Sequence, residues 1–336
     1  MRRFSAARAI LAALVLLWAA VAAAAEPVTI RVGVLQYGTV SWELEVVKRM
    51  GFAEREGVRI EVVPLALKDA ANVAIQGGAV DIIVNDWIWV ARQRAEGRDF
   101  TFVPYSRAVG GIMVRPDAGV RTLSDLRGKR VGVAGGALDK SWLLLRAYSR
   151  KTLGEDAATL VKPVFAAPPL LNELMLRGEL PAALNFWHFA ARLQAAGMQE
   201  LLGIDEILRG LGVEGELPLV GWVFRDGWAA RNRAAVEGFL RATVQAERAM
   251  RDSDALWEEL RPLTRAENDA TLHALRDGFR AGIVAASDAS MEATARQVFA
   301  ILAEEGGAAL VGSARALPAG TFWDRGAARG YAKRPE

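Results

Sequence analysis

The positions of hydrophobic and polar residues divide the chain into alternating strand-like and helix-like segments. After residue 25, segments in which every second residue is apolar alternate with segments in which apolar residues recur every three or four positions. The expected order is strand, helix, strand, helix, strand, helix, strand, at residues 28–35, 43–56, 59–64, 68–76, 80–84, 89–96 and 101–105. Strands that are separated by helices of this length predict a mainly parallel sheet covered by helices.

A second series with the same alternation follows. Strands are expected at residues 111–115, 130–134, 161–165 and 182–185, and helices at 122–126, 139–148 and 168–177. A further strand at 217–224 precedes a C-terminal region that is almost wholly helical, at 232–251, 254–261, 267–281 and 291–304. The repeated alternation predicts an α/β protein whose second lobe has the same class of fold as the first.

The first 25 residues differ from the rest and have the features of a secretory signal. They begin with Arg2, Arg3 and Arg8, continue with an apolar run at 9–20, and end in small residues. The uninterrupted apolar stretch is about 12 to 17 residues, which is short of the roughly 20 that a helix needs to cross a bilayer. We therefore expect a signal peptide at 1–25, cleaved near Ala25, and a protein that is exported to the periplasm.

Removal of this segment changes the charge balance. Three of the 42 basic residues lie in it and none of the 39 acidic residues, so the remainder carries 39 of each. A neutral chain gives no electrostatic reason to expect nucleic acid or an anionic membrane as a partner. The sequence also contains no cysteine, which excludes disulfides, thiolate metal sites, a thiol nucleophile and a lipidated cysteine, so we do not expect a lipoprotein. We expect no metal and no cofactor.

Two stretches of the sequence resemble a known family. The segment 67–83, with its Gly77-Gly78 stop and its Val-Asp-Ile-Ile strand, resembles a segment of the periplasmic substrate-binding proteins of nitrate, sulfonate, taurine and pyrimidine ABC importers. The stretch GGIMVRPDAGV at 110–120, followed by LSDLRGKRVGV at 123–133, is closer still to that family and is the more specific of the two. The similarity runs from about residue 28 to about residue 300, and neither stretch is a catalytic motif.

The resemblance implies a two-lobe periplasmic binding protein, or Venus flytrap, with mixed, mainly parallel sheets. Lobe 1 would comprise residues 26–107 and 223–308, lobe 2 residues 112–216, and a C-terminal tail residues 309–336. The chain would cross between the lobes near 106–111 and 217–222, and the helices after Trp228 would return to pack on lobe 1. A small solute bound between the lobes would close them, and the monomeric receptor would present it to a membrane permease and its ATPase subunit.

The candidate binding residues follow from where ligands lie in such folds. In open α/β sheets, ligands bind beyond the carboxyl ends of the strands, where loops meet the N-termini of helices. The residues at these positions are Gln36, Tyr37, Ser41, Trp42, Asn85, Asp86, Trp87, Gly135, Gly136, Asp139, Ser141, Trp142, Asn185, Trp187 and His188. We predict that the solute contacts residues of this set.

Tryptophan is the most informative residue type near these strand ends. Five of the ten tryptophans, Trp42, Trp87, Trp89, Trp142 and Trp187, fall within a few residues of them. Aromatic rings supply flat apolar area and, for a cation, a negative ring face, although each ring could equally pack in the core. We predict that at least two tryptophans line the ligand and that Trp87, Trp142 and Trp187 converge on one groove.

The charged candidates leave the chemistry of the solute open. Asp86 and Asp139 could contact a solute or could cap helices. Lys140 and Arg107 are the only cations near these loops. The balance favours an aromatic, heterocyclic or cationic organic solute over nitrate or sulfate-like anions, although backbone amides alone can bind an anion.

Two other functions stay open beside import. A sensor or accessory binding protein of the same fold would need no sequence feature that an import receptor lacks. An enzyme related to the thiamine-pyrimidine synthases would draw on a histidine and a cysteine-rich motif, and this chain has no cysteine and only His188 and His273. The sequence therefore favours a periplasmic solute-binding receptor of an ABC importer and not an enzyme.

Overall fold

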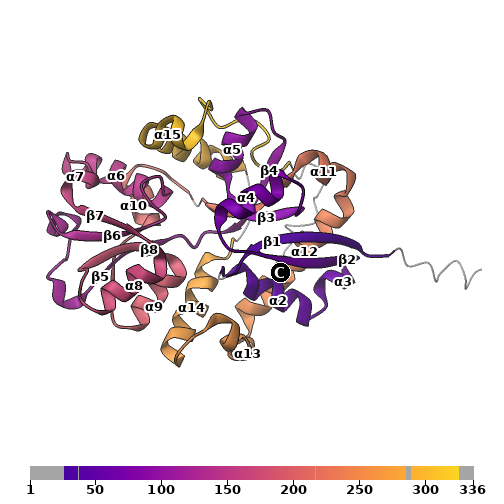
Figure 1. Ribbon diagram of the computed structural model, residues 1–336, viewed down its shortest axis with the longest axis horizontal. Coiled ribbons are helices and arrows are strands. Elements are labelled where there is room, and N and C mark those ends of the chain that lie inside the picture. The colour runs from indigo at the N-terminus through magenta and orange to yellow at the C-terminus, as the bar shows by residue number, and fades with distance from the viewer. Residues whose placement is uncertain (1–25, 37, 216, 285–288, 325–336) are drawn as a thin grey trace, which may run out of the picture.

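Two five-stranded sheets, one in each of two lobes, organise the chain (Figure 1). The computed structural model describes residues 26–36, 38–215, 217–284 and 289–324, so the expected signal peptide and the candidate Tyr37 lie outside the described residues. Within these ranges, no helix combines the length and the apolar character that a membrane span requires. The two mixed sheets confirm the α/β, two-lobe fold that the sequence predicts.

The sheet of the first lobe has the strand order β2-β1-β3-β10-β4. Its strands are β1 (Val28–Leu35), β2 (Val58–Leu65), β3 (Ile82–Asp86), β4 (Phe100–Ser106) and β10 (Val220–Arg225). β1 pairs in parallel with β2 and β3, whereas β10 runs antiparallel to β3 and β4. Position 221 in β10 requires glycine, because a Cβ there would lie 2.2 Å from the carbonyl oxygen of Val103.

The sheet of the second lobe repeats this arrangement, with the strand order β7-β6-β8-β5-β9. Its strands are β5 (Gly110–Val114), β6 (Arg130–Ala134), β7 (Lys162–Ala166), β8 (Ala182–Phe186) and β9 (Gln199–Gly203). β6 is parallel to β7 and β8, and β5 is antiparallel to β8 and β9. In both lobes, therefore, the carboxyl ends of three parallel strands lie at the same edge of the sheet. An antiparallel strand pairs with the last of the three, which is β3 in the first lobe and β8 in the second.

Helices join and cover the strands of each lobe. The first lobe has α2 (Val40–Arg49), α3 (Phe52–Arg55), α4 (Lys68–Gln76), α5 (Trp87–Ala95), α11 (Asp226–Arg231), α12 (Arg233–Asp252) and α13 (Asp254–Thr264). The second has the 3-10 helices η1 (Pro116–Ala118) and η2 (Leu123–Leu126) and the α-helices α6 (Lys140–Leu153), α7 (Ala157–Leu160), α8 (Pro168–Leu176), α9 (Trp187–Ala195) and α10 (Ile204–Gly210). The series α2, α4, α5 of the first lobe corresponds to α6, α8, α9 of the second.

The chain passes between the lobes twice. One crossing, at 107–109, joins β4 to β5, and the other, at 211–219, joins α10 to β10. The first lies within the segment 106–111 that the family resemblance implies, and the second overlaps the implied segment 217–222. The lobe limits themselves, 26–107 with 223–308 and 112–216, stay a prediction.

The last two helices, α14 (Asp269–Gly282) and α15 (Ala289–Val311), do not pack only on the first lobe, as the sequence led us to expect. α14 lies against α9 of the second lobe, and α15 lies against both α6 and α5 (Figure 1). Their apolar faces account for this, because Leu275 and Phe279 of α14 share a core with Ala191 of α9, and Val298 of α15 shares one with Leu143 of α6. The C-terminal helices therefore connect the two lobes.

The expected C-terminal tail, 309–336, is also only partly correct. Its first residues belong to α15, which continues to Val311. Further on, Phe322 forms a parallel bridge with Phe102 at the edge strand β4, and its ring packs against Trp87. Apolar residues near the C-terminus therefore fix the chain to the first lobe as far as the described residues extend.

Candidate ligand-binding cleft

A cavity of about 260 Å³ lies between the lobes, with walls from both. The first lobe contributes the end of β1, the start of α2, the end of β3 and the start of α4. The second lobe contributes the starts of α6 and α9, and both crossing segments complete the wall. The cavity is thus placed where the carboxyl ends of the parallel strands face each other, as expected for ligands of α/β sheets.

Five helices begin at this cavity, which makes its wall rich in positive helix ends. Asp86 caps α5 by accepting from the Trp89 N–H at 2.8 Å, and Asp139 caps α6 by accepting from the Ser141 N–H at 2.9 Å. The N-cap residues of α2, α4 and α9 make no such side-chain hydrogen bond. The first N–H groups of a helix have no partner four residues back within it, and at these ends the Trp187 N–H donates to the Val109 carbonyl oxygen and the Ser41 N–H to that of Gly38. The remaining N–H groups and the helix dipoles favour a bound anion.

Three charged side chains meet in the cavity and link the lobes. The Nζ atoms of Lys68 and of Lys140 each lie 2.6 Å from Oδ2 of Asp86. The side chain of Asp86 is 8% exposed, that of Lys140 20% and that of Lys68 48%. Because Lys140 belongs to the second lobe and Asp86 to the first, the ion pair between them spans the cleft.

The pKa values of this cluster follow from its charges. Burial alone would raise the pKa of Asp86, but the charges of Lys140 and Lys68 outweigh it and hold that pKa well below its usual range. Burial would lower the pKa of Lys140, yet Asp86 and Asp139 raise it above its ordinary value. For Lys68, burial prevails over the attraction of Asp86 and lowers the pKa. Asp86 is therefore a firmly ionised carboxylate that is shared by two ammonium groups.

His188 adds a hydrogen-bonding group without charge. It lies in the first turn of α9 on the wall of the cavity, and its Nδ1 is buried with no hydrogen-bond partner in the described part of the chain. Burial lowers the pKa of His188 to about 3, and the charge of Arg192 acts in the same direction. The imidazole is therefore neutral near pH 7.

The structure brings one third of the predicted site residues together at the cavity. Those on its wall are Asp86, Asp139, Ser141, Trp187 and His188. Their contact with a solute stays a prediction. Gln36, Gly135 and Gly136 lie outside the wall. The two glycines have positive φ values, 79° and 86°, and the missing side chain of Gly135 leaves room for the Asp139 carboxylate. Ser41 is also outside, and its hydroxyl donates to the carbonyl oxygen of Gly38.

The prediction that Trp87, Trp142 and Trp187 converge on one groove is wrong. Trp87 is 0% exposed and packs against Phe322, and Trp142 is 2% exposed with its ring edge-on to Phe165. Trp42 also packs in the core, edge-on to both Trp187 and Trp257, and neither it nor Trp89 is on the cavity wall. Among the tryptophans in the described ranges, only Trp187 lines the cavity.

The two predicted asparagines hold strands to helices and do not face the cavity. The Asn85 amide donates to Asn72 Oδ1 at 2.6 Å, and the Asn185 amide donates to Asn172 Oδ1 at 2.9 Å. In each lobe the pair joins the third parallel strand to the preceding helix. The sequence carries a signal of this repeat, because both pairs are separated by 13 residues and the second asparagine is followed two residues later by tryptophan.

Sequence reasoning missed several residues of the wall, of which Lys68 matters most. Lys68 is the first residue of α4, which follows the carboxyl end of β2. The strand-end rule that selected the other candidates would have selected it too. Tyr105 at the end of β4 and Phe186 at the end of β8 were missed in the same way.

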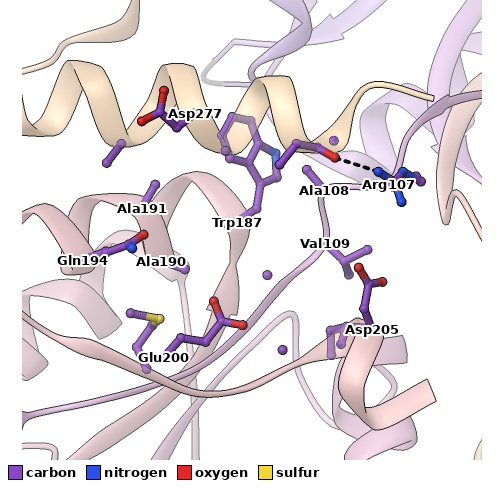
Figure 2. Close-up of a pocket in the computed structure, with 18 of the residues that line it drawn as sticks. Arg107, Ala108, Val109, Trp187, Ala190, Ala191, Gln194, Glu200, Asp205 and Asp277 are labelled. Atoms are coloured by element: carbon purple, nitrogen blue, oxygen red, sulfur yellow. Dashed lines mark hydrogen bonds between the residues drawn. The ribbon is translucent and has the colours of Figure 1, made fainter. Parts of the chain in front are cut away.

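A second hollow, of about 620 Å³, is lined in part by residues 107–109 of the first crossing (Figure 2). It runs between α9 and α14, shares Ala108, Val109 and Trp187 with the cleft, and is bordered by Glu200 and Asp205. Burial, and then the charges of Glu206 and Asp205, raise the pKa of Glu200. The parallel strands do not end here, and no cluster of metal-ligating side chains occurs in the described ranges, so we take the smaller cavity as the candidate site.

The chain matches a known protein family over more than half of its length. The profile of the family described as "NMT1/THI5 like" matches residues 43–253. The chain is also 35% identical over 120 residues to the probable ABC transporter extracellular-binding protein YckB of Bacillus subtilis (strain 168). This match covers 35% of the chain and 39% of YckB, so it spans about two fifths of that relative.

Solved structures share the fold at lower identity. The periplasmic aliphatic sulphonate binding protein SsuA of Escherichia coli is 18% identical, with a TM-score of 0.67 over 83% of this chain and 87% of SsuA. The desulfurization enzyme DszB is 16% identical, with a TM-score of 0.55 over 83% of this chain and 92% of DszB. The fold is therefore that of two-lobe binding proteins, and a solved enzyme uses it as well.

Proposed function

Because this chain belongs to the NMT1/THI5-like family, we propose that it is the solute-binding receptor of an ABC importer and captures a small organic anion between its lobes. The observation that carries the proposal is the cavity whose walls come from both lobes and whose ion pair, Lys140 to Asp86, crosses between them. A ligand that touches both lobes stabilises the closed form by its greater affinity for that form, and closure is what a permease can recognise.

The charge of the cleft supports an anionic solute. The sequence favours an aromatic, heterocyclic or cationic organic solute over plain anions because few basic residues lie near the strand ends, and Lys68 removes that reason. Two lysines and three uncapped helix ends face one cavity, whose remaining wall includes apolar side chains such as Val34, Val40 and Leu219. This combination suits a small anionic head group on an apolar body. The structural similarity to a sulphonate-binding protein makes alkanesulfonates the first solutes to test.

The location and partners of the receptor are part of the proposal. Residues 1–25 would direct export and be removed near Ala25, which leaves a monomer in the periplasm. Its partners would be a permease and an ATPase subunit. YckB, whose name describes an extracellular-binding protein of an ABC transporter, supports this assignment.

An enzymatic role receives less support from the site. The DszB structures include a variant in which a cysteine is replaced by serine, in complex with biphenyl-2-sulfinic acid. This chain has no cysteine, and the cleft holds a neutral histidine beside ionised lysine and aspartate. A periplasmic sensor would use the same cleft, and the presence or absence of permease and ATPase genes beside this gene separates sensing from import.

Binding to the purified protein, freed of ligand by unfolding and refolding, tests the proposal. Titration calorimetry with alkanesulfonates, taurine, nitrate, pyrimidines and amines should show one site per chain that prefers an organic anion. Lys140→Met should weaken that binding at least about thirtyfold, because truncating one partner of a buried charge pair costs about 2–5 kcal/mol. Lys151→Met, at the exposed end of the same helix, is the matched control and should bind as the wild type does. Equal solute affinity in wild type and Lys140→Met would show that the solute does not bind in this cleft.

A further inference from the structure

The ion cluster in the cleft holds two ammonium groups for one carboxylate. Oδ2 of Asp86 accepts from both Lys68 and Lys140, while Oδ1 of the same group accepts from the Trp89 N–H. Each ammonium group carries three N–H donors and uses one of them on Asp86, so further donors remain for a ligand. Asp86 thus holds the two lysines side by side, one from each lobe.

The second carboxylate of the cavity, Asp139, is engaged differently. Its Oδ1 accepts from the backbone N–H groups of Ser141 and Trp142, at 2.9 and 3.4 Å, at the start of α6. Its charge therefore balances the positive end of that helix in addition to acting on Lys140. Asp86 is the only carboxylate in the described part of the chain that forms an ion pair with Lys68 or Lys140.

We propose that Asp86 determines which charge the solute can carry. Asp86 neutralises one of the two lysine charges, so one positive charge remains. A monoanionic head group balances that charge, and a dianionic head group exceeds it. This inference rests on the proposed function of the cleft. Lys140 and Asp86 are largely removed from water and balance each other, whereas Lys68, which is 48% exposed, adds a positive charge that has no second carboxylate as its ion-pair partner in the described part of the chain. A dianion would bring a second negative charge close to the Asp86 carboxylate, and a built-in repulsion of this kind rejects the wrong ligand. Asp86 acts through the two lysines and is a specificity-determining residue.

Asp86→Asn is the variant that tests the inference. Asparagine is isosteric with aspartate and caps helices as well, so the start of α5 should survive the change. Methanesulfonate and sulfate are similar in size but carry one and two negative charges, so their relative affinity reports the preferred charge. The wild type should bind methanesulfonate and discriminate against sulfate. In Asp86→Asn the ratio of the two dissociation constants should move toward sulfate by at least about tenfold at constant ionic strength.

A matched control separates this effect from general electrostatics. Asp69→Asn also removes one negative charge from the start of α4, one residue from Lys68, but Asp69 is exposed and is not on the cavity wall. The ratio of the methanesulfonate and sulfate dissociation constants of Asp69→Asn should equal that of the wild type. A sulfate-induced rise of the melting temperature in Asp86→Asn, absent from wild type and from Asp69→Asn, is a second readout, because a bound ion stabilises the folded state by mass action.

The outcomes distinguish this inference from the proposed function. If the wild type binds no anion of any kind, the proposed function fails. If the wild type binds methanesulfonate and a folded Asp86→Asn keeps the wild-type ratio, only the role of Asp86 fails. If Asp86→Asn does not fold, Lys68→Met replaces it: loss of one ammonium group should move the ratio further against sulfate, and an unchanged or reversed ratio overturns the inference.

Discussion

A buried pair of glutamates predicts that the first lobe loses stability as the pH rises. Glu43 of α2 is 0% exposed, and the side chain of Tyr105 is its polar neighbour. Burial, and then the charge of Glu247 on the adjacent helix α12, raise the pKa of Glu43 well above its ordinary value. Burial raises the pKa of Glu247 to about 8, against the opposing charge of Arg248. Glu247 is therefore protonated in the folded protein near pH 7, and Glu43 keeps its proton to a higher pH than an ordinary glutamate does.

The sign and size of the effect follow from proton binding. The unfolded chain loses the Glu247 proton near the ordinary value of 4.5, whereas the folded chain keeps it to about pH 8. The folded state therefore holds more protons between these values, and its stability falls as the pH rises through this window. At about 1.4 kcal/mol per pH unit, the shift of Glu247 alone amounts to roughly 5 kcal/mol, an upper figure because the two carboxyl groups titrate together.

Glu247→Gln replaces the titratable carboxyl group with a neutral amide and keeps the shape of the side chain. Chemical denaturation of variant and wild type from about pH 5 to about pH 8 should show a free-energy difference that grows in favour of the variant by several kcal/mol. Glu237→Gln, on the same helix but paired with Arg233 at the surface, is the matched control and should show a far smaller change. Parallel stability curves for Glu247→Gln and wild type would refute the reasoning.

Two further predictions concern residues that the sequence placed in the site and the structure places elsewhere. Trp87→Ala and Trp142→Ala should each reduce the free energy of unfolding by about 3–5 kcal/mol, because each empties a large volume in the core, and the folded fraction should keep wild-type solute affinity in calorimetry. A loss of solute affinity with no loss of stability would show that these rings contact the solute. Asn185→Ala should cost about 1–3 kcal/mol in chemical denaturation, because it leaves Oδ1 of Asn172 without its donor, whereas no change would show that the pair is dispensable.

The fold was largely predictable because the alternation of apolar positions reports which elements exist. Strands such as β1 and helices such as α4 lie where the periodicity places them. The same pattern does not say against which element an amphipathic helix packs. The apolar faces of α14 and α15 are visible in the sequence, but their contacts with α9 and α6 depend on the position of the whole second lobe.

The place of the candidate cavity was predictable, but the residues of its wall only in part. The strand-end rule led to Asp86, Asp139 and His188, because it depends only on the topology of the sheet. It does not give the direction of a side chain at the start of a helix. Trp87 and Trp187 stand at equivalent positions in the two lobes, yet the ring of Trp87 is enclosed by the C-terminal segment around Phe322. That enclosure arises from a contact across more than two hundred positions of sequence, which local pattern does not contain.

The central claim, that a solute is held between two lobes, is tested most directly by the distance between the lobes. Val73 on α4 and Leu176 on α8 are exposed, and the natural chain has no cysteine, so Val73→Cys with Leu176→Cys gives two unique positions for spin labels. Double electron-electron resonance should show that a saturating alkanesulfonate narrows the distance distribution to one short distance, and that Lys140→Met broadens it. A distribution that a tightly bound solute leaves unchanged would contradict the account.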